Sequence, residues 1–192
     1  CTGLTDLMWC VTVWWRASWT LTSAMMRPAR MSLVMTDVVI EDERVEFVVE
    51  ADAWSGHDGL MRACLQAIEA GLNAIEDPRT GAAVILFSDD ATVHELNRRF
   101  RDKDKPTNVL SFPAPEREGY PGDVILAYQT CAKEAQAAGI SLIDHAAHLA
   151  LHGVLHLNGF DHQEEDEAAA MEALETAVLT GLGIQDPYLV QE

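Results

Sequence analysis

Positively charged residues are scarce in this chain and absent from its C-terminal part. The 192 residues include 13 lysines and arginines against 31 aspartates and glutamates, a formal net charge of −18, and none of the 13 follows Lys133. Nucleic-acid phosphates are bound chiefly by Lys and Arg, so the overall charge argues against a nucleic-acid partner. The distribution softens this argument, because five of the 13 basic residues lie in the segment 98–105.

Cysteines are also few. The four cysteines, Cys1, Cys10, Cys64 and Cys131, form no C-x-x-C pair and do not have the spacing of zinc ligands. A chain of 192 residues can build a hydrophobic core without a disulfide framework. We therefore expect a protein of the reducing cytoplasm.

A long uninterrupted hydrophobic run is missing as well. Residues 7–26 carry a single charge, Arg16, which argues against a membrane-spanning helix, and Asp6 stands where a signal peptide would have a basic start. We expect residues 1–34 to be an N-terminal extension, either disordered or upstream of the true start, rather than a membrane anchor. Residues 35–192 contain no internal repeat and no long linker, so we expect them to form one domain.

The hydrophobic pattern after residue 35 predicts short strands and amphipathic helices. Apolar residues recur every three or four positions in the helices, and the strands are short β-branched or continuous apolar runs. The predicted strands are 38–40, 45–49, 82–87, 108–112 and 122–127. The predicted helices are 59–75, 90–100, 130–138, 141–157 and a last one that begins near 164–167, with Met171, Leu174, Val178 and Leu182 as its apolar stripe.

Three histidines in the segment 152–162 have the spacing of metal ligands. His152 and His156 lie four residues apart, so on a helix both point from the same face. Gly159 is suited to end that helix in a left-handed turn, after which the chain can reverse and bring back His162. Three imidazoles with an open fourth position predict a catalytic zinc site on a long buried helix and the turn after it.

The same spacing occurs in the metzincin pattern H-E-x-x-H-x-x-G-x-x-H, with one difference. The glutamate that serves zinc proteases as general base follows the first histidine, and here Gly153 holds that place. A glycine cannot accept a proton, so this difference argues against a protease.

Two other polar residues near the motif, Asp161 and His148, have two alternative roles each. Asp161 is a candidate general base, or it orients a ligand histidine. His148, one turn before the first ligand, lies either near the site or in the packed helix. We expect His145 to be exposed.

Several blocks of the chain resemble the YbeY family of bacterial endoribonucleases. They are residues 95–112 (ELNRRFRDKDKPTNVLSF), 122–125 (GDVI), 148–162 (HLALHGVLHLNGFDH) and 186–188 (DPY). The resemblance covers residues 35–192. It implies a single α+β domain in which about five helices pack on a small mixed β-sheet.

The resemblance also implies a function. One zinc ion per chain would be held by His152, His156 and His162, and single-stranded RNA would be cleaved. The implied roles are ribosomal RNA maturation, especially at the 3′ end of 16S rRNA, and ribosome quality control. The implied partners are RNA and small-subunit ribosomal proteins in the cytoplasm, without a membrane.

The basic segment has its own counterpart in the YbeY family. Arg101 matches the arginine of the family's R-G-K-D-K-P-T segment and is the expected catalytic residue, with Asp102 in place of the usual glycine. Arg98, Lys103 and Lys105 are expected to contact the RNA backbone, although a solvated loop would have the same composition.

Two other functions remain open from the sequence. One is a zinc hydrolase with protease-like ligand geometry, which Gly153 argues against. The other is a non-enzymatic ribosome-associated factor, in which zinc only stabilises the fold and Asp161 would be a fourth ligand. The metal itself is also open, since three imidazoles accept nickel, cobalt or copper.

Overall fold

The computed structural model describes residues 43–162 and 164–189. The expected strand at 38–40 and the expected extension at 1–34 lie outside these residues. In the described part, strands and helices form one α+β unit, as predicted. None of the described helices has both the length and the apolar character needed to cross a membrane.

Within residues 43–162 and 164–189, four strands form a mixed sheet in the order β1-β2-β4-β3. The strands are β1 (Val45–Val49), β2 (Ala83–Ser88), β3 (Val109–Pro113) and β4 (Gly122–Ala127). β1, β2 and β4 run parallel, whereas β3 runs antiparallel to β4. The predicted bounds of β1 and β4 are confirmed. β3 begins one residue later and ends one residue later than predicted, and its last residue, Pro113, pairs with Gly122 at the end of the hairpin.

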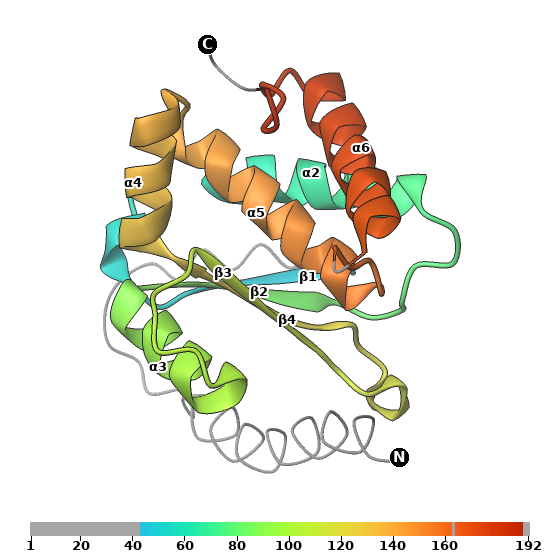
Figure 1. Cartoon of the computed structure of the whole chain (residues 1–192), viewed down its shortest axis with the longest axis horizontal. Helices are drawn as coiled ribbons and strands as arrows, with labels where there is room; N and C mark the ends of the chain where they lie inside the picture. The colour runs from blue at the N-terminus through green and yellow to red at the C-terminus, as the bar shows by residue number, and fades with distance from the viewer. Residues whose placement is uncertain (1–42, 163, 190–192) are drawn as a thin grey trace.

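Five helices of the described part of the chain pack on the two faces of the sheet. They are α2 (Leu60–Ala74), α3 (Asp90–Arg101), α4 (Tyr128–Ala138), α5 (Leu142–Leu157) and α6 (Glu165–Gly181), with short 3₁₀ turns at Asp52–Trp54 and Glu116–Glu118. α3 covers one face of the sheet, and the other four helices lie on the opposite face (Figure 1). Apolar side chains are buried on both faces, with the larger core between the sheet, α2 and α5.

α5 is the most deeply buried helix. It packs against α2, α4, α6 and the strands β3 and β4. Its N-terminus is capped by Ser141, because the backbone N–H of Asp144 donates to Ser141 Oγ at 3.0 Å. Nine of its residues are buried, which confirms a helix that is enclosed on most sides.

α4 begins at Tyr128, two positions before its prediction, for a reason that local sequence does not contain. Its first turn is capped by Asp90 of α3, whose carboxylate accepts from the backbone N–H and the hydroxyl of Thr130 at 2.9 and 2.8 Å. In return, Gln129 Oε1 accepts from the backbone N–H of Asp90 at 2.9 Å. The two helix N-termini therefore cap each other across the fold.

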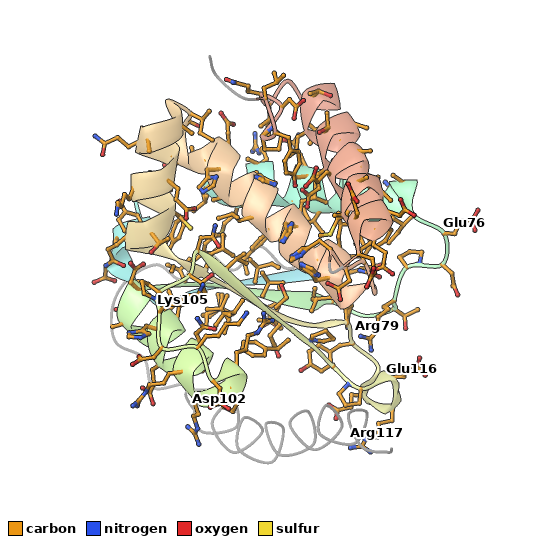
Figure 2. The ribbon with its side chains drawn as sticks, in the orientation of Figure 1. Glu76, Arg79, Asp102, Lys105, Glu116 and Arg117 are labelled. Carbon is orange, nitrogen blue, oxygen red and sulfur yellow. The ribbon has the colours of Figure 1, made fainter. Side chains whose placement is uncertain are left out.

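Arg79, in the loop before β2, ties the end of α5 to the β3–β4 hairpin. Its guanidinium donates to the carbonyl oxygens of Ala114, Pro121 and Leu157, the last two at 3.0 and 3.2 Å. A cation at the C-terminus of a helix is also favoured by the helix dipole. Figure 2 shows Arg79 beside the base of the hairpin, whose tip carries Arg117.

Candidate metal centre

The C-terminal half of α5 and the turn after it bring three histidines together. His152 and His156 lie one turn apart, with their Nε2 atoms 3.1 Å from each other. The helix ends as predicted, because Gly159 has a φ of 91° and the N–H of Phe160 donates back to Leu155 O. One ring nitrogen each from His152, His156 and His162 lies within 4.8 Å of the others, so the group could hold a metal ion.

Hydrogen bonds determine which ring nitrogens face the metal site. The Nδ1 of His152 lies 2.8 Å from Glu175 Oε1, and the Nδ1 of His156 lies 2.8 Å from the carbonyl oxygen of Phe160. A carboxylate and a carbonyl only accept hydrogen bonds, so each Nδ1 carries the proton and each Nε2 presents a lone pair. Two lone pairs facing each other repel, unless a cation or a proton lies between them.

The separation of these nitrogens fits a tetrahedral ion. Bonds of about 2.0–2.1 Å at a tetrahedral angle place two ligand nitrogens about 3.3 Å apart, close to the 3.1 Å observed. Burial and the neighbouring His152 lower the pKa of His156, which favours the neutral form that binds a metal. The third histidine, His162, is exposed, so this side of the histidine group faces solvent.

A buried glutamate that was not predicted from the sequence, Glu175, contacts two of the histidines of α5. Glu175 of α6 has no exposed surface. Besides His152, its carboxylate contacts His148 Nε2 at 3.2 Å and accepts a short hydrogen bond from the Tyr188 hydroxyl. Burial alone would raise the pKa of Glu175, but these three hydrogen bonds lower it to about 2. The carboxylate is therefore ionised at neutral pH.

A signal for Glu175 was present in the sequence. It lies four residues after Met171 and three before Val178, on the predicted apolar stripe of α6, and a glutamate at such a position needs buried partners. The predicted stripe was wrong at Leu182, which follows the end of α6 and is 41% exposed.

The two upstream histidines both have carboxylate partners. His148 lies against Glu175, next to the metal-capable group, so of its two alternatives the one near the site is the one observed. The expectation that His145 is exposed was wrong, because its side chain is only 12% exposed and its Nε2 lies 2.9 Å from Glu134 Oε2. Glu134 belongs to α4, which packs beside α5.

Arg101, the last residue of α3, is held against strand β3. Its Nη2 donates to the carbonyl oxygen of Ser111 at 2.8 Å, and its guanidinium lies 5.8 Å from the centre of the Phe112 ring. Burial lowers the pKa of Arg101 and the charge of Asp161 raises it, and a guanidinium stays charged at physiological pH.

The charge of Asp161 acts on both Arg101 and the histidine motif. Its Oδ1 accepts from the backbone N–H of His162 at 2.8 Å. Its charge raises the pKa of Arg101 and also that of His156, so it is close enough to act on both. Asp161 thus couples Arg101 electrostatically to the histidine motif, although the two are far apart in the chain.

Comparison with known proteins is decisive for the family. The family model described as "Endoribonuclease YbeY" matches residues 51–183. The chain belongs to the YbeY family. Relatives named "Endoribonuclease YbeY" include one from Rhodopseudomonas palustris, 44% identical over 77% of this chain and 82% of its own length.

Other YbeY proteins are as similar. One from Maricaulis maris is 46% identical over 75% of this chain and 91% of its own length. One from Paramagnetospirillum magneticum is 51% identical over 65% of this chain and 80% of its own length. A solution structure of a Thermotoga maritima protein aligns with a TM-score of 0.47 at 21% identity, over 75% of this chain and 99% of that one.

The loop after α3 begins in a left-handed turn at Asp102. Asp102 has a φ of 53°, a left-handed conformation that aspartate tolerates better than most residues. The buried side chain of Asn97 holds the following segment by donating to Lys105 O at 2.7 Å. Lys103 and Lys105 are exposed, whereas Arg98 pairs with Glu95 at 2.7 Å. Figure 2 shows Asp102 and Lys105 at the surface beside α3.

Packing against the sheet explains why position 153, directly after the first motif histidine, is a glycine and not a glutamate. A Cβ at Gly153 would lie 2.9 Å from Val124 Cγ2 and 3.1 Å from Ser111 Oγ, and closer still to Val124 Cγ1. The position faces the sheet, so a longer side chain has no room there.

We expect Gly153→Ala to lower the free energy of unfolding by about 1–3 kcal/mol, because overpacking forces α5 away from the sheet. Chemical denaturation of the metal-free protein measures this. The matched control is Gly181→Ala, where an added Cβ meets nothing within 4 Å; it should be neutral or stabilise by up to about 1 kcal/mol. Equal stability of the two variants would contradict the close approach.

Proposed function

We propose that this protein is a zinc-dependent endoribonuclease that cleaves single-stranded RNA, acting in ribosomal RNA maturation at the 3′ end of 16S rRNA and in ribosome quality control. The observation that carries the proposal is the convergence of three histidine nitrogens within 4.8 Å, with Asp161 acting by its charge on both His156 and Arg101. The names of the YbeY relatives support RNA as the substrate.

We assign the metal ligands to His152, His156 and His162, with one ion per chain. When bound, zinc in such a set supplies Lewis acidity and lowers the pKa of a water molecule to about 7. A second metal-capable group, His148, His152 and Glu175, shares a histidine with the first. Its carboxylate is already satisfied by three side-chain donors, so we assign it a supporting role and no second ion.

Arg101 is the proposed catalytic residue. A guanidinium can donate two parallel hydrogen bonds to a phosphate and offset the negative charge that develops during cleavage. The contacts with Ser111 O and the Phe112 ring hold it in place before RNA binds. Asp161 accepts from the backbone of His162 and acts on Arg101 by its charge, which favours a positioning role over that of a general base.

The basic segment would guide the RNA backbone to the site. Lys103 and Lys105 are exposed in the loop that follows Arg101, which suits contacts to phosphates without base reading. Arg98 is exposed as well, but its ion pair with Glu95 weakens its positive field, so we expect it to contribute less than the lysines.

Partners and location follow from charge and cysteine chemistry. The acidic remainder of the surface suits basic small-subunit ribosomal proteins. The free, buried thiols of Cys64 and Cys131 suit the reducing cytoplasm. We propose that residues 1–34 form an extension outside the catalytic domain, which spans 35–192.

His156→Ala and Arg101→Ala should fail in different ways. We expect His156→Ala to lose both bound zinc and RNA cleavage, because a ligand is removed. Arg101→Ala should keep its zinc and cleave about 100-fold more slowly, because only charge stabilisation is lost. Metal analysis and cleavage of a single-stranded RNA measure this, with His57→Ala and Arg62→Ala as controls. Equal cleavage by all five proteins would point to a contaminating nuclease.

Lys103→Ala and Lys105→Ala should change RNA binding more than the chemical step. Each lost phosphate contact should reduce the slope of log affinity against log salt by about 0.7 for single-stranded RNA. Binding measured between low and high salt tests this, with Lys133→Ala on α4, the one other lysine of the chain, as control. An unchanged slope in both loop variants would mean that the segment is a solvated loop.

A further inference from the structure

The segment after α6, residues 182–189, contacts the metal centre indirectly, through the carboxylate of Glu175 on α6. Oε1 of this carboxylate faces His152 Nδ1 at 2.8 Å, while Oε2 faces His148 Nε2 at 3.2 Å and the Tyr188 hydroxyl. The carboxylate has no exposed surface, and a buried charge is stable only when its oxygens are hydrogen-bonded. These three donors therefore hold the two carboxylate oxygens of Glu175 in a fixed orientation.

Tyr188 is itself fixed in place. After α6 the chain reverses at Gly183, which has a φ of 79°, and the N–H of Ile184 donates to Leu179 O at 2.9 Å. Asp186 Oδ1 then accepts from Tyr188 N at 3.0 Å and from Thr176 Oγ1 at 3.1 Å. Thr176 neighbours Glu175 on α6, so the segment is tied to the helix that carries the carboxylate.

Tyr188 presents two different sides. The residue is 38% exposed, yet its hydroxyl ends on a fully buried carboxylate. Its ring meets the His148 ring edge-on, with centroids 5.9 Å apart. Tyr188 therefore lies between solvent and the buried carboxylate that supports the metal centre, and it is not part of the apolar core.

We propose that Tyr188 is a positioning residue for the metal centre, acting through Glu175 on His152. By occupying Oε2, it keeps Oε1 aimed at His152 Nδ1, which holds the proton there and directs the Nε2 lone pair to the metal. Carboxylates that support ligand histidines in this way contribute about 10–100-fold to metal affinity. The inference rests on the proposed metal ligands, and it makes docking of the C-terminal segment a determinant of metal binding.

The test is zinc affinity, measured by competition with a chromophoric chelator, for Tyr188→Phe and the matched control Tyr128→Phe. Tyr128 loses a hydroxyl that lies 3.4 Å from His57, in the aromatic cluster with Trp54. We expect Tyr188→Phe to bind zinc about 10-fold more weakly, with the control unchanged. The absorption spectrum of the cobalt-loaded Tyr188→Phe protein should also shift, because the ligand field at His152 changes. Unchanged affinity in Tyr188→Phe would overturn the proposal.

A double-mutant cycle shows whether the effect passes through Glu175. We expect Glu175→Gln to weaken zinc binding at least as much, and addition of Tyr188→Phe to Glu175→Gln to cause no further loss. Equal losses in both backgrounds would mean that Tyr188 acts by another route, and would overturn the proposal. The outcome is separable from RNA cleavage: a wild-type protein that binds zinc but leaves RNA intact contradicts the proposed function alone.

Discussion

The close approach of α5 to the sheet determines where the motif histidines point. Gly153 faces Val124 and Ser111 without space for a Cβ. The preceding residue, His152, lies about 100° around the helix and therefore faces α6 rather than the sheet, where Glu175 receives it at 2.8 Å. His156 follows one turn later. The residue that makes the contact thus also removes the general base of a protease, so packing and chemistry are set by the same position.

Two supports from opposite sides hold this arrangement. On the α6 side, the ionised carboxylate of Glu175 keeps the proton of His152 on Nδ1. On the sheet side, β3 carries Ser111, whose carbonyl oxygen fixes Arg101 and whose Oγ lies at the Gly153 position. A cation and the three histidines of the proposed metal site are therefore positioned by rigid elements before any substrate binds, which is the condition for electrostatic stabilisation of a transition state.

Local pattern was enough to predict the elements and the histidine cluster, because caps, periodicity and helical spacing are local properties. The cap at Ser141 and the turn at Gly159 illustrate this. What could not be predicted depends on contacts between distant segments. The start of α4 depends on Asp90 of another helix, and the burial of His145 depends on Glu134. The role of Glu175 needed the fold, although its place on an apolar stripe marked it as unusual.

On the proposed mechanism, one metal ion held by the three histidines is required for RNA cleavage by this protein. The most direct test is to strip the wild-type protein with a chelator and to return zinc in small steps while cleavage of a single-stranded RNA is followed. We predict no cleavage without metal, a linear recovery of the cleavage rate as zinc is added, and a break in this line at one zinc per chain. Cleavage by the stripped protein at the full rate would contradict it.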